Sequence, residues 1–329
     1  MTAVTNPIMT SAAEWEAQRP SLRAQLQQLL GDLPPLLVPD VKILSREVRA
    51  ECVVEHFAFD NGAGAQVFGY LLIPPRLTAP APAVLYLHLH GNKYALGKEE
   101  LFQEGNYGTA PGPALVRQGY VVMAVDAYCF GERQTQGPAG AAESGAVTEQ
   151  ALFKHFVWRG CTLWGMMVRD DLLALNALLN RPEVDPRRVA ATGMSMGGSR
   201  TTWIGALDDR IQVLVPVAQM TRYRDFAATG QYNLHGIYYY LPGFFKAGID
   251  MEHLVALAAP RPQAILIGDQ DPLSPIVGVH TTATFARQIY GLYNAGSRFQ
   301  VMIEPGVAHK YTPTMFNYML DFLKQHIDD

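Results

Sequence analysis

The residue in this chain best suited to covalent chemistry is a serine held between glycines. The stretch "TGMSMGGS" at 192–199 places Ser195 in a Gly-x-Ser-x-Gly pattern, directly after an apolar run and before a helix-like segment. The pattern alone is weak, because a chain of this composition contains it by chance about once in twenty. At a strand-to-helix turn it is a nucleophile elbow, in which glycines relieve collisions around a strained serine and the helix N-terminus supplies amide donors. The alternative is a glycine-rich turn without chemistry.

A serine hydroxyl needs a base, and the base needs an acid that orients it. The segment "LIGDQDPLSP" supplies Asp269 and Asp271 just after an apolar run. We favour Asp271 as the acid, because Asp269 directly follows a glycine and suits a turn. The segment "EPGVAHKYTPTMF" supplies His309 as the base, between the last expected strand and the last expected helix. The order Ser, Asp, His, with each residue at the carboxyl end of a strand, is typical of a catalytic triad on an α/β sheet.

Backbone amides that could bind an oxyanion are expected at two places. Met196 follows the serine and begins the helix, so its N–H is the first expected donor. The run "LYLHLHGNKY" ends an apolar strand with His90-Gly91-Asn92, and we expect the Asn92 N–H to be the second donor. His88 and His90 are expected to brace this loop rather than to transfer protons.

An aromatic segment between two expected strands is the candidate substrate wall. The segment "YRDFAATGQYNLHGIYYYLPGFFKAG" has neither a helical nor a strand period. Tyr238, Tyr239 and Tyr240 near its centre are predicted to contact the acyl or alcohol part of a substrate, since insertions at this edge often carry binding function. The alternative, aromatic packing that only covers the sheet edge, is equally open.

The segment "DAYCFGER" follows another apolar run. Its Asp126 and Arg133 could bind a substrate, but a pair that braces the loop is the favoured interpretation. Cys129 has no neighbouring base in the sequence and is expected to be a packed thiol.

The elements that would position these residues alternate between strand and helix. Short apolar runs such as "APAVLYLHLHG" and "YVVMAVDAY" are typical of parallel strands covered on both faces, and helix-like segments such as "LWGMMVRDDLLALNALLN" separate them. This alternation predicts an α/β fold with a mostly parallel central sheet and helices on both faces. Before it, "CVVEHFAFD" and "QVFGYLLIP" predict an antiparallel hairpin, and "AAEWEAQRPSLRAQLQQLL" predicts an N-terminal helix. We expect an N-terminal helical extension over 1–40 and one domain over 41–329, with a cap or insertion at 222–250.

Composition speaks against several function classes. With 49% hydrophobic and 17% charged residues, the chain is typical of a folded globular protein. Its net charge of −4, without blocks of like charge, gives no reason to expect nucleic acid or a membrane as a partner. The three cysteines are widely spaced and no histidine–carboxylate cluster has metal spacing, so we expect no disulfide framework, no metal and no cofactor. The N-terminus lacks the pattern of a secretory signal, and no apolar run reaches bilayer length, so a cytoplasmic location is expected.

These motifs resemble the α/β-hydrolase superfamily over the chain from about residue 15 onward. Within it, "WEAQR", "VVMAVDAYCFGER", "EVDPRRVAATGMSMGG" and "LIGDQDPLSP" are similar to the branch of dienelactone hydrolase-like proteins and acetyl xylan esterases, or cephalosporin C deacetylases. The resemblance implies Ser195 as nucleophile, Asp271 as acid and His309 as base, and proteins of this branch are often homo-oligomers. The nucleophile is serine where true dienelactone hydrolases use cysteine, so lactone chemistry is not expected.

The resulting hypothesis is a serine carboxylic-ester hydrolase that forms an acyl-enzyme on small-molecule or carbohydrate esters with a small acyl group, acetyl foremost. Two alternatives stay open. One is a serine peptidase of the prolyl oligopeptidase type, whose hydrolase domain resembles this chain, although no propeller sequence precedes it here. The other is a non-catalytic binding protein on a hydrolase fold. Such proteins usually lack a triad member, whereas the expected triad here is complete.

Overall fold

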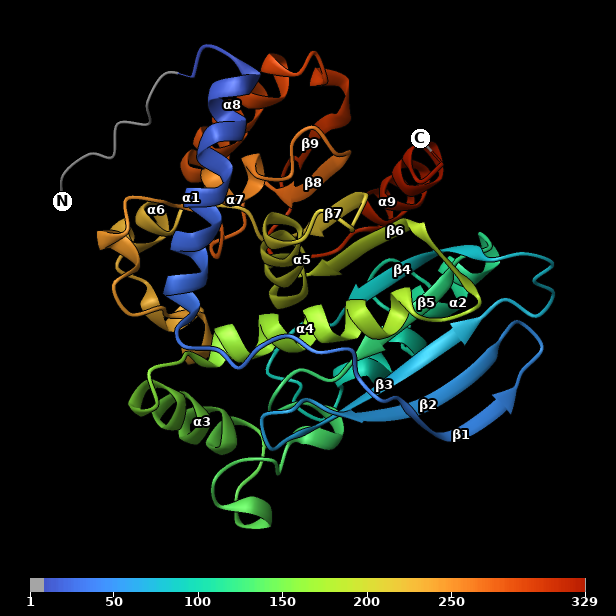
Figure 1. The fold of residues 1–329 in the computed structure, drawn as a ribbon. Coiled ribbons are helices and arrows are strands. Elements are labelled where there is room, and N and C mark those ends of the chain that lie inside the picture. The colour runs from blue at the N-terminus through green and yellow to red at the C-terminus, as the bar shows by residue number, and fades with distance from the viewer. Residues whose placement is uncertain (1–8, 329) are drawn as a thin grey trace.

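In residues 9–328, the part of the chain that the computed structural model describes, nine strands form one sheet (Figure 1). The strands are β1 Lys42–Val48, β2 Val53–Asp60, β3 Gln66–Ile73, β4 Ala81–Leu87, β5 Val121–Val125, β6 Val184–Met194, β7 Val213–Val217, β8 Gln263–Gly268 and β9 Phe299–Glu304. Their order across the sheet is β1-β2-β3-β5-β4-β6-β7-β8-β9. The pairs β1–β2, β2–β3 and β3–β5 are antiparallel. The pairs β5–β4, β4–β6, β6–β7, β7–β8 and β8–β9 are parallel. The expected α/β fold with a mostly parallel sheet is confirmed.

Helices cover both faces of this sheet, as expected. The α-helices are α1 Ala12–Leu30, α2 Pro111–Arg117, α3 Ala146–Trp158, α4 Leu163–Leu179, α5 Met196–Leu207, α6 Tyr223–Ala228, α7 Met251–Ala256, α8 Ile276–Leu292 and α9 Pro313–His326. Apolar side chains of α1, α4, α5, α7 and α8 form one core, and those of α2 and α9 form the other. Along β4, Leu85 and Leu87 belong to the first core and Val84 and Tyr86 to the second, because successive strand side chains point to opposite faces.

The antiparallel hairpin expected before the parallel sheet is formed by β2 and β3, with Val53 opposite Ile73 at its open end. The sequence patterns do not indicate β1, α3 or α7. All seven residues of β1 are exposed at the edge of the sheet. Because neither face of this strand is buried, its sequence KILSREV needs no regular alternation of apolar and polar residues and has none. Residues 1–8 of the predicted extension over 1–40 lie outside the described part of the chain. The division into extension, domain and insertion stays a prediction.

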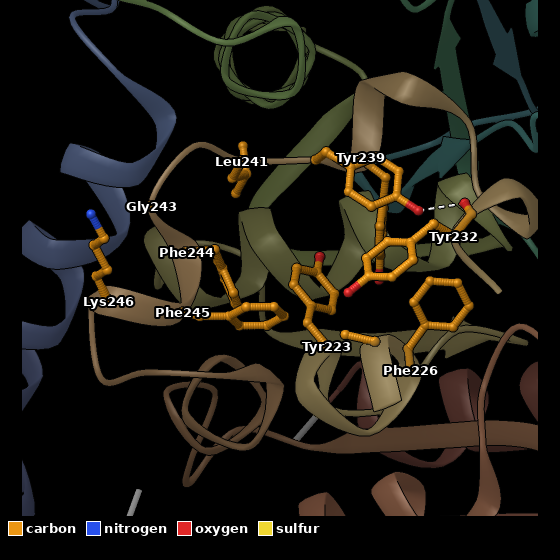
Figure 2. A pocket seen from close by; sticks show the side chains of 11 residues that line it. Tyr223, Phe226, Tyr232, Tyr239, Leu241, Gly243, Phe244, Phe245 and Lys246 are labelled. Carbon is orange, nitrogen blue, oxygen red and sulfur yellow. Dashed lines mark hydrogen bonds between the residues drawn. The ribbon is translucent and has the colours of Figure 1, made fainter. Parts of the chain in front are cut away.

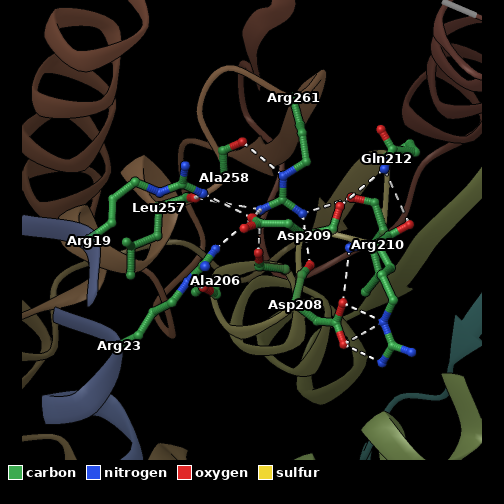
Figure 3. Close-up of polar contacts among 12 residues, drawn as sticks. Arg19, Arg23, Ala206, Asp208, Asp209, Arg210, Gln212, Leu257, Ala258 and Arg261 are labelled. Atoms are coloured by element: carbon green, nitrogen blue, oxygen red, sulfur yellow. Dashed lines mark hydrogen bonds and ion pairs between the residues drawn. The ribbon is translucent and has the colours of Figure 1, made fainter. Parts of the chain in front are cut away.

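A cluster of arginines around one carboxylate joins α1 to the body (Figure 3). Arg19 Nη2 and Arg23 Nη2 of α1 donate to Asp209 Oδ1 at 2.9 and 2.5 Å. Arg261 Nη2, from the turn before β8, lies 3.3 Å from the same oxygen. Arg23 Nε also donates to the carbonyl oxygen of Ala206 in the last turn of α5. These contacts fix α1 to the end of the helix that follows the serine turn.

Candidate active site

Ser195 lies on a strained turn between β6 and α5. Its φ is +58° and its ψ −116°, a backbone conformation that residues with a side chain rarely adopt. The Ser195 N–H donates to the carbonyl oxygen of Val217 on the neighbouring strand at 2.8 Å, which holds the turn against β7. A Cβ at Gly193 or Gly197 would collide with the carbonyl oxygen of Leu87 on β4. The two glycines are therefore required by the close approach of the turn to the sheet, as a nucleophile elbow demands.

The three residues expected to form a triad lie within hydrogen-bond distance of one another. His309 Nε2 is 2.8 Å from Ser195 Oγ, and His309 Nδ1 is 2.7 Å from Asp271 Oδ2. Because the carboxylate accepts a hydrogen bond from Nδ1, Nε2 is left unprotonated and can accept the hydroxyl proton of the serine. The side chain of Asp271 is fully buried, whereas that of His309 is partly exposed. The arrangement matches the geometry of a nucleophile, a base and an orienting acid.

The choice between the two neighbouring carboxylates is decided by the loop after β8. Asp271 contacts His309, and its Oδ1 also accepts from the N–H of Leu273 at 2.9 Å. Asp269 instead accepts from the N–H of Gly306 at 2.7 Å and so stabilises the neighbouring turn. The geometry agrees with the expectation that Asp271 faces the histidine and Asp269 serves a turn.

His235 lies beside the loop that carries Asp271. Its Nε2 donates to the carbonyl oxygen of Leu273 at 3.2 Å. Burial lowers the pKa of His235 to about 4. The ring is therefore neutral at pH 7, and it lies beside the loop that carries Asp271. No sequence motif marks this histidine, because it belongs to the segment without periodicity.

The two expected oxyanion donors differ in their availability. The Met196 N–H is the first amide of α5 and has no acceptor within the helix. The Asn92 N–H donates to His90 Nδ1 at 3.1 Å, so in this structure it is occupied by a side chain of its own loop. His90 Nε2 in turn lies 2.8 Å from Glu149 Oε2 on α3. Of the expected pair, only the Met196 amide is free of such a partner.

The loop after β4 is braced from several sides, as expected for His88 and His90. His88 Nε2 accepts from the N–H of Ala127 at 3.0 Å, and Arg200 of α5 donates to the carbonyl oxygen of His88 at 3.0 Å. The Leu89 N–H donates to Glu100 Oε2 at 2.7 Å. Burial raises the pKa of Glu100 to about 7. These contacts hold the loop that carries Asn92 close to the serine turn.

The three tyrosines predicted to contact a substrate have different positions. Tyr239 and Tyr240 line an aromatic pocket in the insertion (Figure 2). Tyr238 does not line it: its ring is buried and stacks on His90, with ring centroids 5.0 Å apart and an angle of 19° between planes. The predicted contact of Tyr238 with a substrate stays a prediction. The Tyr238 ring supports the loop after β4 because the insertion folds back over α3 and α4, where Trp164 also meets this ring.

The expected pairing of Asp126 with Arg133 is wrong. The carboxylate of Asp126 accepts from Lys98 Nζ at 2.9 Å, and Arg133 Nη2 donates to Asp170 Oδ2 at 2.8 Å. Arg133 touches Asp126 only at its backbone carbonyl oxygen, at 2.9 Å. The sequence places the two residues seven apart, but each charge is neutralised by a residue distant in the chain. All four side chains are buried, so their role is to brace the loop.

Two further observations concern only residues 9–328. Within them, no group of three or more His, Cys, Asp or Glu side chains is arranged to hold a metal ion. In the same part of the chain, no helix has both the length and the apolar composition that crossing a membrane requires.

Comparison with known proteins agrees with this fold. The family model "Prolyl oligopeptidase family" matches residues 155–329. The protein named "Putative hydrolase YtaP" of Bacillus subtilis (strain 168) is 34% identical over 309 residues, which cover 93% of this chain and 99% of that protein. The expected relation to the α/β-hydrolase superfamily is confirmed. The matching family is the prolyl oligopeptidase family, which the sequence analysis named as the peptidase alternative.

Solved structures share the fold at lower identity. The glucuronoyl esterase from Solibacter usitatus has a TM-score of 0.73 and 17% identity, with 96% of this chain and 93% of that chain covered. Acetyl xylan esterase 1 from Thermoanaerobacterium sp. JW/SL YS485 has a TM-score of 0.59 and 17% identity, with 92% and 98% covered. The chain thus belongs to the prolyl oligopeptidase family of serine hydrolases and has the α/β-hydrolase fold that esterases share.

Proposed function

We propose that this protein is a serine carboxylic-ester hydrolase that acts through an acyl-enzyme on small acyl esters, acetyl esters foremost. The observation that carries the proposal is the hydrogen-bonded chain from Ser195 Oγ through His309 to Asp271, with distances of 2.8 and 2.7 Å. These two hydrogen bonds support proton transfer from the serine hydroxyl as it attacks a carbonyl carbon. The strained elbow supports the same role, because it presents the hydroxyl at the carboxyl edge of the sheet.

In the proposed reaction, Ser195 attacks the ester carbonyl while His309 Nε2 takes the hydroxyl proton. The buried carboxylate of Asp271 stabilises the imidazolium and fixes its orientation. The tetrahedral intermediate collapses, and the alcohol leaves with the proton from His309. Water then attacks the acyl-enzyme with His309 again as base, which releases the acid and restores the serine.

The developing oxyanion would be bound first by the Met196 N–H. Loss of one such donor typically raises the barrier by about 3 kcal/mol. The Asn92 N–H becomes the second donor when it exchanges His90 Nδ1 for the substrate oxygen. The stacked Tyr238 and the carboxylate of Glu149 hold the ring of His90 in place, so this exchange requires movement of Asn92 and not of the histidine.

The substrate class is a small-molecule or carbohydrate ester. It is supported by the proteins that share the fold over nearly the whole chain, which are named glucuronoyl esterase and acetyl xylan esterase. A cytoplasmic location belongs to the same proposal, and three cysteines that form no disulfide support a reducing compartment.

The test is hydrolysis of p-nitrophenyl acetate by Ser195→Ala. Activity should fall by at least about a thousandfold, because the nucleophile is lost while the oxyanion donors remain. Ser297→Ala, at an exposed serine of a surface turn, is the matched control and should keep wild-type activity. Wild-type turnover by Ser195→Ala would reject the proposal.

A second candidate is a peptidase, which the match to the prolyl oligopeptidase family favours. The same three side chains would serve this reaction, with an amine in place of the alcohol as the leaving group. Peptidyl p-nitroanilides compared with p-nitrophenyl esters separate the two. A fluorophosphonate probe that fails to label Ser195 would instead point to a non-catalytic binding protein.

A further inference from the structure

The insertion after β7 encloses a pocket of about 300 Å³ whose walls are mostly aromatic rings (Figure 2). The ring side chains come from α6 and from the irregular segment that follows it. The rings that matter here are those of Tyr223, Phe226, Tyr232, Tyr239, Phe244 and Phe245. Lys246, a charged residue of the wall, lies at the edge and away from the ring cluster in Figure 2.

The polar groups of this wall are largely engaged with the protein. The Tyr223 hydroxyl accepts from Trp203 Nε1 at 3.4 Å, and the Tyr239 hydroxyl accepts from the side-chain amide of Gln219. The Tyr240 hydroxyl donates to a backbone carbonyl oxygen of the same segment. Ring faces and edges are therefore what the wall offers to a ligand. Such a surface binds flat apolar groups by stacking and edge contacts.

One imidazole separates this pocket from the loop of the catalytic acid. The rings of Phe226 and Tyr239, which line the pocket, lie 4.4 and 4.3 Å from the ring of His235, centroid to centroid. His235 Nε2 bonds to Leu273 O at 3.2 Å, and the Leu273 N–H bonds to Asp271 at 2.9 Å. His235 therefore contacts both the pocket wall and the loop that carries Asp271.

The volume fits one ring with a short linker. A dry apolar cavity of about 150 Å³ holds benzene. The pocket has a volume of about 300 Å³, roughly twice that reference volume, which leaves room for the atoms that join a ring to an ester group.

We propose that this pocket binds an uncharged aromatic ring of the substrate, so that the protein prefers esters that carry such a ring on the acyl or the alcohol part. The inference rests on the proposed esterase function and narrows its substrate class beyond acetyl esters of simple alcohols. The shared chemistry is a neutral ring within a few bonds of the ester.

Three esters distinguish the two sources of the ring. Benzyl acetate carries it on the alcohol, ethyl phenylacetate carries it on the acyl group, and ethyl acetate carries none. We expect kcat/KM for one of the two ring esters to exceed that for ethyl acetate by about tenfold or more, as expected for a filled apolar pocket. Equal kcat/KM for all three esters would overturn the inference.

Ala227 lines the pocket from α6, and Ala227→Leu fills part of it. This variant should lower kcat/KM for the preferred ring ester about tenfold and change that for ethyl acetate less than twofold. Phe245→Ala, at a partly exposed wall residue, removes a ring contact instead of filling the pocket. It should lower kcat/KM for the preferred ring ester as well. Tyr318→Ala on α9, a half-buried aromatic that stacks on Phe322 and not on the pocket, is the control and should leave the preference unchanged. Wild-type preference in both pocket variants would contradict the inference.

Binding to Ser195→Ala separates this inference from the proposed function. Benzyl acetate and ethyl phenylacetate are titrated into Ser195→Ala protein, with and without Ala227→Leu, and binding is followed by calorimetry. If one of the two ring esters binds and Ala227→Leu abolishes this binding, while wild-type protein hydrolyses none of the three esters, the pocket stands and the esterase function fails. If wild-type protein hydrolyses ethyl acetate but neither ring ester binds, the pocket assignment fails alone.

Discussion

Asp271 Oδ2 lies 2.7 Å from His309 Nδ1, and the aspartate side chain is fully buried beneath the histidine. Two residues earlier, Asp269 has the same chemistry but bonds to a backbone amide of the next loop. The two carboxylates form a natural matched pair, because they share one loop and differ in what they contact.

The first prediction uses this pair. Asp271→Asn should lower kcat for ester hydrolysis by about 10⁴-fold, because the amide favours the wrong tautomer of the histidine. Asp269→Asn should change kcat only a few-fold, since it weakens one turn hydrogen bond. Steady-state kinetics with p-nitrophenyl acetate measures both. Equal losses in the two variants would contradict Asp271 as the acid.

The second prediction concerns the elbow glycine. Gly197→Ala places a methyl group against the carbonyl oxygen of Leu87, which belongs to the backbone of a central strand and cannot move aside. We expect a loss of several kcal/mol in the free energy of unfolding together with loss of activity. Gly291→Ala in α8, where a methyl group meets no atom within 4 Å, should stabilise the protein by about 0.5 to 1 kcal/mol. Denaturant unfolding decides the comparison, and a neutral Gly197→Ala would show that the turn is not constrained.

The third prediction is a pH dependence of stability that arises at Glu100. Burial raises the pKa of this carboxyl from 4.5 to about 7, so between these pH values the folded protein holds a proton that the unfolded chain has released. The folded state binds more protons, and its stability therefore falls as the pH rises through this window.

In Glu100→Gln this contribution is absent. Between pH 5 and pH 8 the wild type should lose about 2 kcal/mol more unfolding free energy than the variant. Urea titrations at the two pH values measure the difference. Glu104→Gln, at an exposed glutamate nearby, is the control and should follow the wild type. Parallel behaviour of wild type and Glu100→Gln would show that Glu100 does not titrate in this range.

The fourth prediction concerns the attachment of α1. Asp209→Asn removes the carboxylate that faces Arg19, Arg23 and Arg261, so three guanidinium groups remain close together (Figure 3). Because this carboxylate is half exposed, we expect a moderate loss of about 1 to 2 kcal/mol in unfolding free energy. Asp328→Asn breaks an exposed pair with Arg188 and should cost less than about 0.5 kcal/mol. Thermal melts of both variants test this, and no shift in Asp209→Asn would mean that apolar packing alone holds α1.

The sequence by itself determined the type of sheet, the strained serine turn and the residues of the proposed triad. Each of these leaves a local signal, such as a short apolar run, a Gly-x-Ser-x-Gly turn or a carboxylate just after a strand. Strand order then brings residues 114 and 38 positions apart into contact at the carboxyl edge, as parallel strands must.

Only the tertiary structure decided which partners the remaining polar and aromatic groups take. Arg133 pairs with Asp170 and not with Asp126, the Asn92 amide is held by His90, and Tyr238 supports that histidine and leaves the pocket to its neighbours. The first and the third of these contacts join residues far apart in the chain. A buried charge or ring is placed by whatever surface packs against it, and that surface is not encoded in adjacent residues.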